Sequence, residues 1–413
     1  MSATLEAYAE AAGQDAIQHL RHLARPLRGA RVVHVNSTAV GGGVAEILAR
    51  LIPLKRELGI DATWEIIEGD AEFYAATKGF HNALQGQRVD LPRRLVEHWL
   101  EVNRTNAERL RATLAGADFV FIHDPQPAPL FGAIPDRRGR WVWRCHIDVS
   151  HPHRPVWKTL RTVVRGYDAS VFSMAAFAQP LPHPQYLVPP SIDPLSQKNR
   201  PLDPDEAARA TAPFGLDPTR PVILQVSRFD RFKDPVGVIR AFRMVRPHVP
   251  IQLVLAGGSA SDDPEGEEVL AEVRAEAADD PDIHVLLLPP DAHTTINALQ
   301  RLATIVVQKS LREGFGLTVT EALWKGRPVI GGEAGGITLQ VFDNHTGFLV
   351  NTPEGAAFRI RYLLSRPELI AAMGIKGRRL VRENFLLTRH LREYLTLILA
   401  LKDAAVDRVE VAS

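Results

Sequence analysis

The segment RVVHVNSTAVGGGVAEILARLIPL, residues 31–54, indicates the fold of the first half of the chain. Residues 31–35 are typical of a buried β-strand, and a glycine triplet at 41–43 follows closely. Apolar residues then recur every three to four positions through residues 44–58, which predicts an amphipathic helix. A strand, a glycine turn and a helix in this order open many nucleotide-binding α/β domains.

Strand-like and helix-like segments alternate after this unit, and the pattern restarts in the second half of the chain. Between Val188 and Pro213 several prolines crowd a short polar stretch, which is typical of a linker. Alternating strands and helices favour parallel sheets. The sequence therefore predicts an α/β protein of two Rossmann-like domains, residues 1–195 and 214–385, followed by an amphipathic helix within 386–413.

Composition narrows the class of protein without giving a function. The 413 residues suit two or three domains, and the 45% hydrophobic content suits packed cores. A net charge of +1 argues against a general nucleic-acid binder, and the single cysteine excludes an internal disulfide. Neither a membrane span nor a secretory signal is found, so we expect a soluble cytoplasmic protein.

The first candidate site is the glycine triplet itself, since glycines after a strand let backbone amides approach a phosphate. The match to G-x-G-x-x-G is incomplete, because Glu46 stands where the third glycine belongs. A tight turn without a ligand and a nicotinamide-binding Rossmann domain are both alternatives. Glu65 or Glu68 would bind the ribose in the latter.

The second candidate is SRFDRFKD, residues 227–234, directly after an expected strand. Arg228 and Lys233 would lie at the carboxyl edge of a sheet, where α/β domains bind ligands. Two cations there suit a diphosphate, with arginine offering a fork of donors and lysine a point charge. The alternative is a solvated charged loop.

The third candidate, EGFGLTVTEAL at residues 313–323, is the most specific. Gly314 and Gly316 permit a tight turn before a helix that begins near Leu317. Glu313 then precedes the helix and Glu321 lies about one turn inside it, where both could accept hydrogen bonds from hydroxyls. Otherwise Glu313 offsets the helix dipole and Glu321 is a surface residue.

Two more glycine and histidine motifs follow strand-like runs. The turn GGEAGG, residues 331–336, could present amides to a phosphate. In CHID, His146 and Asp148 would share a face if the preceding strand continues. A metal site is weighed here because His151 and His153 follow, but the spacing matches no zinc motif.

A polar segment at 65–87 is rich in groups that recognise polyhydroxy ligands, and the residues HDPQ at 123–126 resemble it. Phe73, Tyr74 and Phe80 are candidates for stacking on a sugar ring. The alternative is an ordinary helix and loop.

The Arg228…Lys233 pair and the E-x7-E motif of Glu313 and Glu321 resemble retaining GT-B glycosyltransferases of glycosyltransferase family 4, which includes glycogen and sucrose synthases. The stretches VNSTAVGGGVAEIL, WEIIEGD…TKGFHNALQG, FIHDPQPAPL and WRCHIDVS, within residues 35–150, resemble the trehalose glycosyltransferring synthases of that family. They are also similar to retaining trehalose phosphorylases.

The resemblance implies two Rossmann-like domains that face a central cleft, with an acceptor-binding N-terminal domain and a nucleotide-sugar-binding C-terminal domain. The final helix, residues 386–413, would cross back onto the first domain. The implied reaction transfers glucose reversibly from ADP-, UDP- or GDP-glucose to free glucose and forms α,α-trehalose with retention. Attack from the front face would need no protein base.

Residue by residue, the resemblance assigns the diphosphate to Arg228 and Lys233, the ribose to Glu321, donor-glucose hydroxyls to Glu313, and the region near C6 to His146. Three groups of site residues are implied. The catalytic group is Arg228, Lys233, Glu313 and His146; the donor-binding group is Gly42, Gly43, Gly314, Phe315, Gly316, Leu317, Glu321, Gly335 and Gly336; the acceptor-binding group is Glu68, His81, Asn82, Gln85, Asp124 and Gln126.

No metal site and no required cofactor are expected, although Mg²⁺ can stimulate such reactions through the donor diphosphate. The expected partners are NDP-glucose and glucose, or trehalose and NDP in reverse, without nucleic acid or membrane, and a homodimer is left open. Trehalose phosphorylase is the nearest alternative. Another nucleotide-sugar glycosyltransferase and a non-catalytic sugar-binding protein are further ones.

Overall fold

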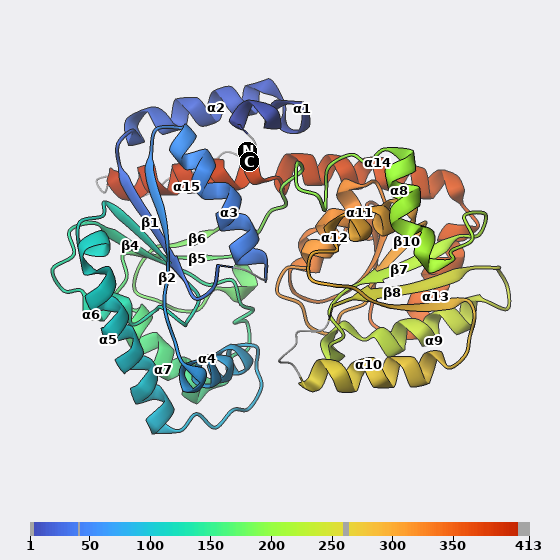
Figure 1. Cartoon of the computed structure of the whole chain (residues 1–413), viewed down its shortest axis with the longest axis horizontal. Helices are drawn as coiled ribbons and strands as arrows, with labels where there is room; N and C mark the ends of the chain where they lie inside the picture. The colour runs from blue at the N-terminus through green and yellow to red at the C-terminus, as the bar shows by residue number, and fades with distance from the viewer. Residues whose placement is uncertain (1–3, 40–41, 259–263, 404–413) are drawn as a thin grey trace. The chain divides into compact units, whose positions relative to one another are not determined.

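The computed structural model describes residues 4–39, 42–258 and 264–403. These residues form two parallel six-stranded sheets, each in a compact unit with helices on both faces (Figure 1). The first unit runs to Pro190 and takes in the chain again from Leu387, whereas the second unit is Ser191–Leu386. The α/β class and the parallel sheets predicted from the sequence are therefore confirmed.

The first sheet has the strand order β2-β1-β3-β4-β5-β6. Its strands are β1 (Arg31–Asn36), β2 (Asp61–Ile66), β3 (Phe119–His123), β4 (Arg140–Arg144), β5 (Ala169–Phe172) and β6 (Gln185–Leu187). The helices of this unit are α1 (Ala9–Ala12), α2 (Gln14–Ala24), α3 (Gly42–Glu57), α4 (Ala71–Leu84), α5 (Arg93–Ala115), α6 (Leu130–Ala133), α7 (Arg154–Val164) and α15 (Leu387–Lys402). The late helix α15 packs against α2 and α3.

The second sheet has the order β12-β11-β10-β7-β8-β9. Its strands are β7 (Val222–Val226), β8 (Gln252–Gly257), β9 (Ile283–Leu287), β10 (Ile305–Gln308), β11 (Val329–Gly332) and β12 (Gly347–Val350). The helices are α8 (Pro204–Thr211), α9 (Pro235–Val245), α10 (Pro264–Ala277), α11 (His293–Leu302), α12 (Leu317–Trp324), α13 (Pro353–Leu364) and α14 (Pro367–Asn384). Residues 191–213, interpreted above as linker, thus fold with the second unit and include α8.

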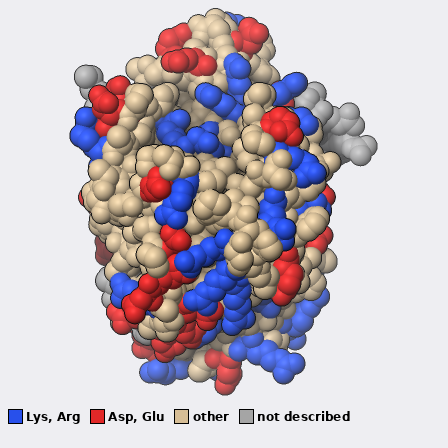
Figure 2. All heavy atoms as spheres, turned by 90° about the vertical axis from the view of Figure 1, so that its right-hand side faces the viewer, with Lys and Arg blue, Asp and Glu red and all other residues tan. Residues whose placement is uncertain are grey.

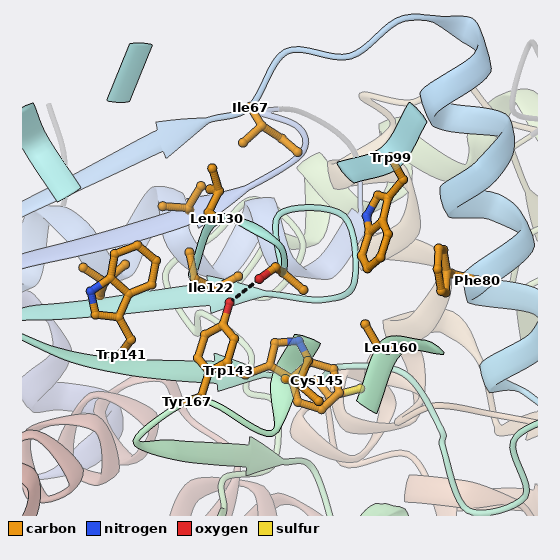
Figure 3. Close-up of a cluster of buried hydrophobic side chains, with 14 of the residues drawn as sticks. Ile67, Phe80, Trp99, Ile122, Leu130, Trp141, Trp143, Cys145, Leu160 and Tyr167 are labelled. Atoms are coloured by element: carbon orange, nitrogen blue, oxygen red, sulfur yellow. Dashed lines mark hydrogen bonds between the residues drawn. The ribbon is translucent and has the colours of Figure 1, made fainter. Parts of the chain in front are cut away.

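The core of the first unit is built from strands β1, β3, β4 and β5 and the helices that cover them, and it is rich in aromatic side chains (Figure 3). Trp99, Trp141 and Trp143 are fully buried. Most polar atoms in this view have a partner: Tyr167 Oη donates to the carbonyl oxygen of Ala128 at 2.7 Å, and Trp143 Nε1 donates to that of Asp124 at 3.1 Å, whereas Trp141 Nε1 is buried without one. Cys145 lies in the same cluster, and burial raises the pKa of its thiol, so it is a packing residue.

Burial also corrects one expectation from the sequence. Phe73 and Phe80 are fully buried on the inner face of α4 and belong to the core, so they cannot stack on a sugar. Tyr74, on the outer side, is exposed. The periodicity of a helix alone does not separate an aromatic core residue from a stacking platform.

Surface charge is mixed in sign. Figure 2 shows acidic and basic side chains lying side by side on one face of the molecule. Ion pairs account for part of this pattern, such as Arg243 of α9 with Glu276 of α10 at 3.1 Å. No helix in the described part of the chain has the length and hydropathy that crossing a membrane requires.

Candidate active site

The strand order of the second unit brings two predicted motifs to one edge of its sheet. Strand β7 lies between β8 and β10, and the chain leaves β7 and β10 in opposite directions across the sheet. In open α/β sheets, ligands bind outside the carboxyl ends of strands at such a reversal. The loop with Arg228 and Lys233 follows β7, and the loop with Glu313 follows β10.

A partly buried ion pair joins these two loops. Lys233 Nζ donates to Glu313 Oε2 at 2.7 Å, and the two side chains are 17% and 10% exposed. Ser310 Oγ donates to the same carboxylate oxygen at 3.1 Å. Charge-assisted hydrogen bonds between groups removed from water hold side chains in one geometry better than surface pairs do. The pair therefore fixes both groups at the sheet edge.

Local capping explains why Lys233 points toward this edge. Asp230 accepts a hydrogen bond from the backbone N–H of Phe232 at 2.7 Å and caps a 3-10 turn over Arg231–Lys233. Gln225 Nε2 donates to the carbonyl oxygen of Lys233 at 2.8 Å, which ties the turn to strand β7. Asp234 then adopts a left-handed conformation, φ 50°, and caps α9.

Two glycine turns pack directly on the backbone around Glu313. A Cβ at Gly335 would lie 1.7 Å from the carbonyl oxygen of Glu313, and one at Gly336 would lie 2.6 Å from Phe315 Cα. The N–H of Gly336 donates to the carbonyl oxygen of Gly314 at 3.1 Å. These positions require glycine because the two turns touch backbone to backbone.

Gln340 clamps the two turns together, and no sequence pattern singles it out. Its buried Nε2 donates to the carbonyl oxygens of Phe315 at 2.8 Å and Gly336 at 3.1 Å. Its Oε1 accepts from Thr320 Oγ1 at 2.6 Å. Ser310 was missed for a similar reason, since one glutamine or serine in a loop carries no pattern.

The remaining residues predicted for this unit lie in different surroundings. The Arg228 side chain is 63% exposed and approaches Asp230 at 3.5 Å. Glu321, inside α12, is 5% exposed, and its Oε2 accepts from Gln300 at 3.5 Å. The surface position considered for Glu321 is therefore wrong. Leu317 begins α12, as the sequence predicts.

The first unit also gathers predicted residues at the reversal of its strand order, next to β1, β3 and β4. The backbone N–H of His146 donates to Asp124 Oδ1 at 2.7 Å. Asp124 has a left-handed backbone, φ 65°, and its N–H donates to the carbonyl oxygen of Arg144 at 2.8 Å. Burial raises the pKa of the Asp124 carboxyl to about 6, against the hydrogen bond from His146.

Strand β4 ends at Arg144, so His146 and Asp148 lie in the loop after it rather than on one face of a continuing strand. His146 is half-buried. Its Nε2 lies 2.9 Å from His123 Nδ1, the end residue of the neighbouring strand β3. The strand end therefore leaves His146 at the sheet edge and couples it to β3.

Other predicted residues of this unit are spread along the chain. Gly42 and Gly43 are the first residues of α3, while Gly41 lies outside the described residues. Glu68 is exposed and pairs with Arg109 at 3.6 Å. His81 and Asn82 lie in the last turn of α4, Gln85 is its C-cap, and Gln126 accepts hydrogen bonds through its backbone oxygen.

Of the three buried side chains behind His146, His123 lay in the polar segment selected at 123–126, whereas the other two were not selected from the sequence. His34 of β1, Lys55 of α3 and His123 of β3 are almost fully buried and hydrogen-bond in series. Two histidines inside apolar strands were the available clue, because buried polar groups need partners. Among the described residues, no group of three His, Cys, Asp or Glu side chains could hold a metal ion.

Comparisons with known proteins agree in both halves of the chain. Residues 34–179 match the family described as "Trehalose synthase, N-terminal domain", and residues 208–380 match "Glycosyl transferases group 1". A trehalose synthase of Pyrococcus horikoshii is 44% identical over 399 residues, 95% of each chain. A trehalose phosphorylase of Pleurotus pulmonarius is 30% identical over 86% of this chain and 54% of its own length.

The fold has solved counterparts. A trehalose-6-phosphate synthase structure from E. coli, bound with UDP-2-fluoro glucose, aligns with TM-score 0.73 and 16% identity over 91% of this chain and 99% of that one. The fold and the family matches together define a glycosyltransferase of the two-domain GT-B class. Within that class, the chain belongs to the trehalose synthase family.

Proposed function

We propose that this enzyme transfers glucose from a nucleoside diphosphate-glucose to free glucose and forms α,α-trehalose, reversibly and with retention of configuration. The Lys233–Glu313 pair at the sheet reversal of the second unit carries the proposal. The pair places a cation, which suits a diphosphate, beside a carboxylate, which can accept hydrogen bonds from sugar hydroxyls. We infer the product, α,α-trehalose, from the trehalose synthase relatives.

The second unit has the groups to bind the donor. Arg228 and Lys233 lie in one loop and would hold the diphosphate, with amides of the glycine turns beside them. Glu313 would accept hydrogen bonds from the donor-glucose hydroxyls, and Glu321 from the ribose. Negative charge grows on the departing diphosphate in the transition state, so cations fixed beforehand stabilise it without reorganising.

Glu313 is better suited to binding than to covalent catalysis. Retaining hydrolases provide a carboxylate nucleophile with a second carboxyl about 5 Å away. Glu313 instead accepts hydrogen bonds from Lys233 and Ser310, whereas Glu321 of α12 accepts one from Gln300 of α11. We therefore assign front-face attack, in which the acceptor hydroxyl passes its proton to the leaving phosphate oxygen and the protein positions both sugars.

The first unit would bind the acceptor. Asp124 and His146 are joined by a hydrogen bond of 2.7 Å at the sheet reversal of this unit, and we assign both to sugar binding. We assign His81, Asn82 and Gln85 to the acceptor because they lie together at the end of α4. No metal enters this mechanism, although Mg²⁺ can accompany the donor diphosphate.

Phosphorolysis of trehalose is the second candidate, and the 30% identity to a trehalose phosphorylase favours it. In that reaction inorganic phosphate would occupy the place of the nucleotide's distal phosphate. The chain spans only 54% of that relative but 95% of the trehalose synthase, so the nucleotide-dependent reaction is preferred.

A donor–acceptor screen tests the proposal. The full chain is incubated with ADP-, UDP- or GDP-glucose and with glucose, glucose 6-phosphate or phosphate, and the product is identified by NMR. We expect α,α-trehalose from free glucose with at least one donor. Trehalose incubated with nucleoside diphosphate should release glucose and re-form the donor. Release of sugar from trehalose with phosphate alone would instead establish the phosphorylase. No trehalose from any pair would reject the proposed reaction, and no release of sugar with phosphate would reject the phosphorylase.

A further inference from the structure

Four side chains of the first unit form an unbroken hydrogen-bonded series. Lys55 Nζ lies 2.6 Å from His34 Nε2, and His34 Nδ1 lies 3.0 Å from His123 Nε2. His123 Nδ1 then lies 2.9 Å from His146 Nε2. The series thus runs from helix α3 through strands β1 and β3 to the loop after β4, where His146 is half-buried at the sheet edge.

The surroundings keep the three imidazole rings neutral. His34 and Lys55 are fully buried and His123 is 2% exposed. Burial lowers the pKa of His34 and His146 well below their usual value, and that of His123 to about 3. The rings also stack, with centroids of His34 and His123 5.3 Å apart and those of His123 and His146 5.2 Å apart.

Aromatic rings favour the charged form of Lys55. Its Nζ lies 5.2 Å from the ring centroid of Phe121 and 5.0 Å from that of Tyr394, within range of a cation–π interaction. Burial opposes this and lowers the pKa of Lys55 to about 7. The other ionisable groups around the series are Arg144, Asp124 and His390, together with the Tyr394 hydroxyl. Below pH 7 the ammonium form prevails.

An ammonium group fixes the direction of every hydrogen bond in the series. It can only donate, so Nε2 of His34 accepts and the proton of that neutral ring is on Nδ1. The Nδ1–H of His34 donates to Nε2 of His123, and the Nδ1–H of His123 donates to Nε2 of His146. The proton of His146 is then on Nδ1, the ring nitrogen that the series leaves available.

We propose that Lys55 is a positioning residue that acts through His34 and His123 to hold His146 as its Nδ1–H tautomer, so that His146 offers a hydrogen-bond donor to a sugar hydroxyl. The tautomer follows from the series itself. The assignment of a sugar hydroxyl as the ligand of His146 rests on the proposed function. A donor at this position binds a hydroxyl through its oxygen lone pair, which leaves the hydroxyl proton free for another acceptor.

The tautomer can be measured without substrate. The full chain, labelled with ¹⁵N in its histidine rings, is studied by long-range ¹H–¹⁵N NMR at pH 6, and His146 is assigned by loss of its signals in His146→Asn. We expect a protonated Nδ1 and an unprotonated Nε2 for His146. A protonated Nε2 in the parent protein would overturn the proposal, even if no variant at Lys55 folds.

Substitution at Lys55 tests its control of the series. Lys55→Met removes the donor but keeps the length of the side chain, so His146 should lose its single tautomer and show the Nε2–H form as well. Tyr394→Phe is the matched control, because it keeps the ring over Lys55 and should leave the tautomer unchanged. An unchanged His146 spectrum in folded Lys55→Met would show that Lys55 does not control it.

Activity then separates the two parts of the proposal. Asn at position 146 can place an amide nitrogen where Nδ1 lies, whereas Gln extends toward the position of Nε2. We expect His146→Asn to retain about 10-fold more glucosyl transfer than His146→Gln, in kcat rather than in KM for the acceptor. Equal loss in both would reject the sugar contact but not the tautomer. Absence of trehalose synthesis in the parent would reject the proposed function alone.

Discussion

The two units present different electrostatics at the same kind of place. Each has candidate residues where its strand order reverses, next to β1 and β3 in the first unit and next to β7 and β10 in the second. In the second unit a lysine meets a carboxylate, Glu313. In the first, Lys55 meets an imidazole nitrogen and two aromatic rings, and burial lowers its pKa. A shared geometry therefore supports a charged pair in one unit and a largely neutral series in the other.

The largest effect expected from this contrast is the pH dependence that Lys55 gives to stability. Its pKa is about 7 in the folded chain and 10.5 as the ordinary value, so between these values the unfolded state binds more protons. The free energy of unfolding should then rise with pH from 7 to 10.5 by about 4 kcal/mol. Chemical denaturation across this range measures it.

Lys55→Met should lack this rise, because methionine does not titrate. Lys402→Met, which removes an exposed lysine of the same unit, serves as the control and should keep the rise. Parallel curves for the parent chain and Lys55→Met would contradict the assignment.

The next effect concerns catalysis in the second unit. Lys233→Met should lower glucosyl transfer by on the order of 10²-fold or more, since a preorganised charge at a developing anion contributes about 3 kcal/mol. Arg246→Met removes an ion-paired cation beyond the end of α9 and should leave the rate nearly unchanged. Steady-state rates of both variants test this prediction. A near-normal kcat in folded Lys233→Met would show that Lys233 does not stabilise the diphosphate.

A smaller effect tests the backbone support of Glu313. Gly335 and Gly215 both have left-handed backbones, φ 46° and 63°, but only Gly335 lacks room for a Cβ. Alanine at Gly215 should cost about 1 kcal/mol from strain alone. Alanine at Gly335 should cost about 1–3 kcal/mol more and impair transfer, because the carbonyl of Glu313 must move. If the two alanine variants shift the denaturation midpoint equally, the contact between residue 335 and the carbonyl of Glu313 relaxes without cost.

The smallest expected effect concerns Asp124. Its pKa is about 6 in the folded chain and 3.8 as the ordinary value, so its contribution to stability is full below pH 4 and is lost as pH rises through 6. Because the side chain is partly exposed, we expect about 1–2 kcal/mol. Asp124→Asn keeps an oxygen for the His146 N–H and should flatten this part of the profile. The same slope in both proteins would contradict the raised pKa.

Much of the fold could be predicted because hydrophobic runs and glycine turns are local. The strand expected directly before residue 227 matches β7, while β6 and β12, which are short edge strands with weak patterns, were not predicted. The prolines of 188–213 were interpreted as linker, yet Pro204 occupies the first turn of α8, where its missing N–H costs nothing.

The candidate site was predicted in part, and contacts across the sequence explain the rest. The sequence placed Lys233 after an expected strand and Glu313 before a helix, but it could not show that β7 and β10 are neighbours or that the two side chains bond to each other. Phe73 and Phe80 of α4 were misplaced because a core face and a binding face have the same period. The His34–His123 contact depends on strand pairing, which a single sequence does not reveal.

Helix α15 completes the fold of the first unit, although it follows the second unit in the sequence. Arg389 donates to the carbonyl oxygens of Pro189 and Pro190, and Tyr394 lies over Lys55. These contacts join residues about two hundred or more positions apart within the first unit, whereas the second unit is one continuous stretch. The second unit can therefore complete its fold without α15, whereas the first cannot, although most of the first is synthesised earlier. A chain truncated after Leu386 would carry a complete second unit and an open first one.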